Sequence, residues 1–239
     1  MKYRNLTIIG TSHIAQQSLD EVKKAIEDEK PEIVALELDK RRLYALMSAK
    51  KGKIRFSDVF KVGVKGFLFS LIGAWAEKKL GEQVGIMPGA EMKMAVRLAN
   101  KDKIRLALID QDIEVTLKRL SKSLTWKEKW NFIADIFKAV VLRKKEVEFD
   151  LRTVPDKKLI KKLINQVKKR YPNVYNVLVK ERNEFMAKKL VKLMKMKESE
   201  KILAIVGAGH EEEIIDLIKK NINKVDISYT VSVGESQKF

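Results

Sequence analysis

Cysteine is absent from the 239 residues, and only two histidines are present. The lack of cysteine excludes structural disulfides, thiolate metal sites and a cysteine nucleophile. Any histidine chemistry must therefore use His13 or His210. Long apolar runs are also lacking: the uncharged segment 66–76 is far shorter than the roughly 20 residues that a membrane-spanning helix needs. We expect a buried or surface-lying helix there, and a strand rather than a signal peptide at residues 1–10.

Acidic residues are few relative to basic ones, since 50 Lys and Arg against 32 Asp and Glu leave a net charge of +18. A lysine-rich chain with little histidine is typical of heat-adapted cytoplasmic proteins. The alternative is attraction to an acidic partner, either nucleic acid or an anionic membrane surface. The later lysines recur at helical spacing without a nucleic-acid-binding motif, so no specific nucleic acid is expected. We predict a cytoplasmic protein or the cytoplasmic domain of a membrane protein, with homodimer formation left open.

Short apolar runs alternate with segments of helical periodicity. The first four runs are continuous, as expected for strands covered on both faces. Each is followed by a helical pattern, at residues 15–29, 39–50, 113–120 and 211–221. This alternation predicts an α/β fold with a mostly parallel central sheet flanked by helices. The predicted strands are 6–9, 33–38, 104–109, 202–206 and 225–231.

Two longer helical segments interrupt this alternation. One lies at about 56–100, and the other, at about 125–197, contains breaks near Pro155 and Pro172. At about 150 residues per domain, the length predicts one or two domains. We interpret residues 1–239 as a single α/β domain with a large helical insertion or cap.

A strand–Gly–x–x–His–helix unit occurs twice, ending at His13 and at His210. In both units glycine closes the strand and allows a tight turn. Loops at the carboxyl ends of parallel strands form the binding crevice of such sheets, so both histidines should face it. A helix N-terminus favours the neutral imidazole, which is the form that binds a divalent metal. The alternative is two unrelated polar turns.

Carboxylates follow two other predicted strands. Glu37 closes an apolar strand, and a carboxylate buried there needs a cation or a metal. Arg41, four residues on, could pair with it and merely fix the loop. Asp110 follows the third strand and is a candidate for the same crevice. Asp112 is predicted to be an N-cap.

Charged residues on two further helices are also candidates. Glu91 falls in the first turn of a helix, where the macrodipole alone favours an acid. Glu181 lies on the apolar stripe of a helix, with Arg182 beside it. Paired charges on a buried helix face are often functional.

The candidate residues lie in six segments: GTSHIAQQS (10–18), PEIVALELDKRR (31–42), LGEQVGIMPGAEMKMA (80–95), LIDQDIEVTLKR (108–119), KERNEFMAKKL (180–190) and VGAGHEEEI (206–214). In this order the segments resemble the TraB/PrgY family, which is related to GumN and the TIKI proteins. Gln111 departs from the pattern, because the family usually has Arg between the two aspartates.

The resemblance implies an α/β fold with a metal-binding crevice. For the TIKI branch it implies a metal-dependent peptidase that uses Mn or Co, and for the plasmid branch shutdown of a peptide pheromone. Archaeal relatives often carry C-terminal membrane segments, and none is present in this sequence. The first hypothesis is therefore a metal-dependent hydrolase of peptides in which His13, His210 and Glu37 are ligands. Mn or Co is the expected metal, and Zn or Fe would also suit these ligands.

The other candidates take supporting roles in this hypothesis. Glu91 or Asp110 would be the general base or a further ligand. Arg41 and Arg182 would orient carboxylates or stabilise developing negative charge, and Glu181 would fix Arg182. The second hypothesis is a protein that binds peptides, or tethers or signals at a membrane, without catalysis.

Overall fold

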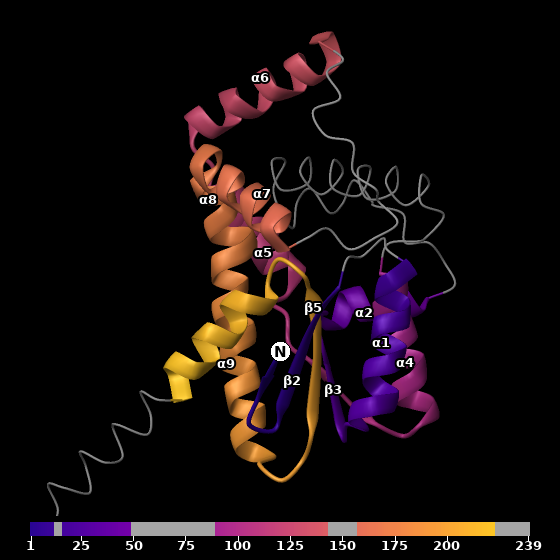
Figure 1. The fold of residues 1–239 in the computed structure, drawn as a ribbon. Helices are drawn as coiled ribbons and strands as arrows, with labels where there is room; N and C mark the ends of the chain where they lie inside the picture. Colours follow the sequence, from indigo (N-terminus) through magenta and orange to yellow (C-terminus); the bar gives the residue numbers. More distant parts are fainter. Residues whose placement is uncertain (12–15, 49–88, 143–156, 223–239) are drawn as a thin grey trace, which may run out of the picture.

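Five strands form one sheet in the computed structural model of the protein (Figure 1), which describes residues 1–11, 16–48, 89–142 and 157–222. Their order across the sheet is β1-β2-β5-β3-β4. The last four are mutually parallel, and β1 pairs antiparallel with β2. The predicted α/β class and mostly parallel sheet are confirmed, while the predicted strand 225–231 lies outside the described residues. The strands are β1 (Lys2–Tyr3), β2 (Leu6–Thr11), β3 (Ile33–Leu36), β4 (Arg105–Leu108) and β5 (Ile202–Gly207).

The central strand β5 sets the register of the sheet. Ile202 is paired with Leu6 of β2 on one side and with Ile33 of β3 on the other. All six residues of β5 are buried, which explains its continuous apolar sequence. Since the three strands run in parallel and start in register, their carboxyl ends meet at one edge.

Helices cover both faces of this sheet (Figure 1). On one face, α1 and α4 contribute Val22, Met92 and Val96 to a cluster with Leu36 and Leu203. The helices of the described residues are α1 (Gln16–Glu29), α2 (Lys40–Met47), α4 (Ala90–Lys101), α5 (Ile113–Ser123), α6 (Trp126–Leu142), α7 (Lys157–Arg170), α8 (Pro172–Tyr175), the π-helical turn η1 (Asn176–Lys180), α9 (Glu181–Met196) and a helix over residues 211–222.

The opposite face is covered by α9 and by the helix 211–222. Met186 and Leu190 of α9 and Ile214 and Ile218 of the last helix pack against Ile202 and neighbouring strand residues. The end of the predicted 125–197 insert therefore belongs to the layer that covers the sheet, as does α4 at the end of the predicted 56–100 insert. None of the helices within the described ranges is long and apolar enough to cross a bilayer.

Gly10 lies inside β2, whereas the sequence predicted that it would close the strand and begin a turn. A Cβ at Gly10 would lie 2.9 Å from Ala208 Cα and 3.0 Å from Glu211 Oε2. Glycine is therefore needed because the chain at Ala208, in the second Gly-x-x-His unit, passes directly over Gly10 in β2.

We expect Gly10→Ala to destabilise the fold by about 1–3 kcal/mol, because the backbone at Ala208 must move to admit the methyl group. Urea denaturation followed by circular dichroism measures this loss. An unchanged midpoint would contradict the close approach of Ala208 to Gly10.

Candidate functional site

Charged side chains collect where β3 and β4 end, next to the loop that follows β5. Glu37 follows β3 directly and is 3% exposed, and Asp110 lies two residues beyond β4 and is also 3% exposed. The backbone N–H of Gly207, the last residue of β5, donates to Glu37 Oε2 over 2.6 Å. The predicted convergence of Glu37 and Asp110 at one edge is therefore observed, and two buried carboxylates lie together.

Arg182, in the first turn of α9, joins these two carboxylates. Its Nη2 donates to Glu37 Oε1 over 2.5 Å and to Asp110 Oδ2 over 2.7 Å, and its Nε donates to Asp110 Oδ1 over 3.1 Å. Burial acts to lower the pKa of the Arg182 guanidinium, but Glu37 and Asp110 outweigh this effect and raise the pKa above its ordinary value. Arg182 therefore stays charged and ties α9 to two strand ends.

A second arginine completes the cluster, and it is Arg42 rather than the predicted Arg41. Asp39 caps α2 by accepting from the backbone N–H groups of Arg41 and Arg42, which sets the phase of the helix. Arg42 Nη1 then donates to Asp110 Oδ2 over 2.8 Å. The two carboxylates and two guanidinium groups cancel in formal charge.

Arg41 points away from Glu37, so the expected pairing of these two residues is wrong. Arg41 pairs with Glu114 and lies 3.7 Å, Nε to Oδ2, from Asp112, and its side chain is 56% exposed. Neighbouring residues of a helix differ by about 100° in direction, so only one of the two arginines can face the strand ends. Asp112 caps α5 by accepting from the N–H of Glu114, as predicted.

His210 lies beside Glu37 and is oriented by Asn183. Its Nδ1 is 2.5 Å from Asn183 Oδ1, and its Nε2 is 3.6 Å from Glu37 Oε1. Asn183 Nδ2 donates to Glu213 Oε2 over 2.8 Å. Because a carboxylate can only accept, Glu213 fixes the amide with its oxygen toward His210. The Nδ1–H of His210 therefore donates to Asn183, so in the neutral imidazole the Nε2 lone pair lies on the side of Glu37.

This arrangement suits a metal ligand. A metal-bound histidine usually donates its other ring N–H to an oxygen acceptor, as His210 does to Asn183. Two donors that bind one ion at 2.0–2.2 Å lie roughly 3–3.5 Å apart, close to the 3.6 Å between His210 Nε2 and Glu37 Oε1. Arg182 already binds the same oxygen, so we expect Glu37 to give at most one bond to a cation.

Within the described ranges, no three His, Asp or Glu side chains come together as a metal-ion cluster. His13, the third predicted ligand, lies outside the described residues. Glu37 and His210 are therefore the two members of the predicted ligand set that lie within the described residues.

The remaining candidates lie at different places. Glu91 is in the first turn of α4 and is 1% exposed. The prediction that Glu181 fixes Arg182 is wrong. It accepts from Arg119 Nε and Nη2 over 2.5 and 2.7 Å, and from Asn176 over 3.1 Å. Adjacent helical positions diverge in direction, and this separates Glu181 from the partners of Arg182.

Sequence reasoning missed Asn183 and Glu213 as site residues, and it placed Arg42 at the end of the motif ELDxxR but assigned the catalytic role to Arg41. All three lie inside the quoted family-like segments, and Asn183 follows Arg182 directly. A structural signal also marks the start of α9, where Asn183 lies, since the π-helical turn η1 directly precedes this helix and such turns are frequent at functional sites.

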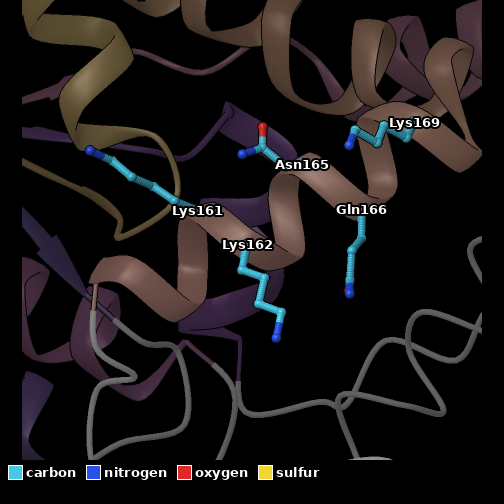
Figure 2. Close-up of a pocket in the computed structure, with 5 residues that line it drawn as sticks. All are labelled: Lys161, Lys162, Asn165, Gln166 and Lys169. Atoms are coloured by element: carbon cyan, nitrogen blue, oxygen red, sulfur yellow. The ribbon is translucent and has the colours of Figure 1, made fainter.

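The hollow drawn in Figure 2 is separate from this cluster. It has a volume of about 490 Å³, and its lining residues all come from α7: Lys161, Lys162, Asn165, Gln166 and Lys169. Among the described residues, its lining contains neither a carboxylate nor an imidazole.

The fold and the buried cluster together define an α/β protein with a polar site at the carboxyl edge of a parallel sheet. The TraB/PrgY/gumN family description matches residues 2–223, and the chain belongs to this family. The sequence-based resemblance is thereby confirmed.

Two relatives illustrate the range of the family. An uncharacterized protein from Methanocaldococcus jannaschii, MJ1365, is 38% identical over 98% of this chain and 59% of its own length. A human TraB domain-containing protein is 22% identical over 85% of this chain and 60% of its own length. The chain therefore spans about three-fifths of the length of these relatives.

We expect Arg182→Gln to destabilise the protein by about 3–5 kcal/mol, because it leaves Glu37 and Asp110 buried without this cation. Arg119→Gln is the matched control, since it breaks a pair with Glu181 in which the arginine is 56% exposed. That change should cost less than about 1 kcal/mol. Urea unfolding of both variants checks the difference, and equal losses would contradict a structural role for the buried cluster.

Proposed function

We propose that the protein is a metal-dependent hydrolase that acts on peptides. The observation that carries the proposal is the pair of donors formed by His210 Nε2 and Glu37 Oε1, 3.6 Å apart, with Asn183 orienting the imidazole. Buried charges at the carboxyl edge of a parallel sheet are rarely required for packing and mark a functional site. The family resemblance supports the choice of peptides as substrates.

His210, Glu37 and His13 would hold Mn or Co, and Zn or Fe would also suit these nitrogen and oxygen donors. A bound ion of this kind would supply a Lewis acid that polarises the scissile carbonyl. The amide of Asn183 keeps His210 in the tautomer whose Nε2 can bind. Glu37 holds its second oxygen against the N–H of Gly207, which fixes the plane of the carboxylate.

The two arginines would orient the carboxylates of the site. Arg182 donates to Glu37, Asp110 and the carbonyl of Leu178, and Arg42 donates to Asp110, so both arginines hold these acids in place. Asp110 accepts four hydrogen bonds from Arg42, Arg182 and the N–H of Gln111, so it serves to position the arginines. Glu91, buried in the first turn of α4, stays the candidate for the general base or a further ligand.

We also propose a cellular location and a role for this activity. The cysteine-free, lysine-rich composition supports the cytoplasm of a heat-adapted organism. Inactivation of a peptide signal is the role that the family resemblance favours.

We expect His210→Ala and His13→Ala each to abolish binding of Mn and Co while the fold stays intact. Asn183→Ala should weaken metal binding by about 10–100-fold, because it frees the orientation of His210. Isothermal titration measures these affinities, with the exposed Asn165→Ala as the matched control. Unchanged affinity in both histidine variants would contradict the proposed site.

Hydrolysis is tested by incubating a peptide library with the metal-loaded protein and identifying products by mass spectrometry. New termini that disappear in the His210→Ala variant support the hydrolase. Peptides that are retained by the metal-loaded protein but never cleaved would instead favour the second hypothesis, a peptide-binding or tethering protein.

A further inference from the structure

The polar face of the helix α6 packs against the residues that end α7 and begin α8. Glu128 accepts from the backbone N–H and the amide of Asn173 over 2.7 and 3.0 Å. One turn on, the amide of Asn131 donates to the carbonyl of Arg170 over 3.3 Å, and Asp135 pairs with the guanidinium of the same residue. Positions 128, 131 and 135 fall within about 60° of one another around the helix. Hydrogen bonds and an ion pair to Arg170 and Asn173 therefore attach this face of α6 to the rest of the protein.

The opposite face of α6 carries apolar side chains in solvent. Trp126, Trp130 and Ile133, here called the tryptophan stripe, are 74%, 67% and 56% exposed. Lys127 and Lys129 flank the stripe on its two sides, and Lys129 Nζ lies 4.3 Å from the centre of the Trp126 ring. A helix on the surface of a soluble protein shows the reverse polarity, and exposed apolar patches mark interaction surfaces.

The charge of the neighbouring helix α7 and of the whole chain indicates the kind of partner. Arg170, the residue that holds α6, ends α7, which contains seven basic residues and no acidic one. The whole chain carries a net charge of +18. A second copy docked on the stripe would bring like charges together. The stripe also offers roughly 400 Å² of apolar surface, about half of what each partner of a stable dimer buries.

We propose that the tryptophan stripe and its flanking lysines bind the surface of an anionic lipid bilayer, with α6 lying in the interface. Tryptophan is favoured at the headgroup level because its ring is apolar and its N–H can remain hydrated. Lysines beside it attract anionic headgroups. Figure 1 shows α6 at one end of the molecule, where a flat surface can reach it. The proposal does not depend on the hydrolase activity.

The apolar contribution is tested with the full chain and vesicles of phosphatidylcholine, either alone or mixed with phosphatidylglycerol. Co-sedimentation should show binding only to the mixed vesicles, with a blue shift of tryptophan emission. Trp126→Gln/Trp130→Gln should lower the partition coefficient at least about tenfold. Met196→Gln, at another apolar position that is 65% exposed, should change it less than about twofold.

The charge contribution is tested by Lys127→Gln/Lys129→Gln. We expect a loss of about 25-fold, from roughly fivefold per lysine at the membrane surface. Lys23→Gln/Lys24→Gln on α1 removes the same charge from exposed positions of another helix and should cost less than about threefold.

Three results would overturn the proposal. One is absence of binding to the mixed vesicles, and another is an equal loss in the α1 control, which would indicate attraction by net charge alone. The third is unchanged vesicle binding in the tryptophan variant together with loss of a dimer, or of duplex DNA binding, in sedimentation equilibrium. That result would assign the stripe to a second copy or to nucleic acid.

Discussion

The ion pair between Arg182 and the carboxylates of Glu37 and Asp110 is the interaction on which the site depends. It joins the ends of β3 and β4 to the first turn of α9, and through Glu37 it reaches the last residue of β5. Buried ion pairs add little net stability compared with apolar packing, yet removing one partner is costly. The cluster therefore acts as a constraint on geometry: α9 must lie where its arginine meets both acids, and this brings Asn183 to His210.

The consequence is a directed chain of polar groups. Glu213 fixes Asn183, Asn183 fixes the tautomer of His210, and His210 faces Glu37, whose other oxygen is held by Gly207. Each step follows from which atoms can only accept and which can donate. The first member, Glu213, lies in the first turn of the helix 211–222, and the third, His210, directly precedes this helix. A single short segment therefore supplies both the ligand candidate and the group that orients its support.

Much of the fold could be predicted from sequence because four of the strands are continuous apolar runs and β-α alternation allows few topologies. The strand-end residues Glu37 and Asp110 could be predicted for the same reason. Helical residues were harder: the choice between Arg41 and Arg42, or the partner of Glu181, depends on the rotation of a helix about its axis. That rotation is set by caps and packing, such as Asp39 on α2, and sequence periodicity specifies it only to within about one residue.

The same limit explains why α6 could not be interpreted from its sequence alone. Its apolar positions at 126, 130 and 133 form an ordinary amphipathic stripe, and such a stripe normally faces the core. Only the contacts of Glu128, Asn131 and Asp135 show that the polar side is the attached one. Glu128 is only 2% exposed, but it accepts hydrogen bonds from Thr125 and Asn173, and Asp135 accepts from Arg170 and Tyr171. Each carboxylate is therefore matched by several donors, which offsets the cost of its lost hydration. The orientation of α6 thus follows from satisfied polar groups, and the exposure of its tryptophans follows from that orientation.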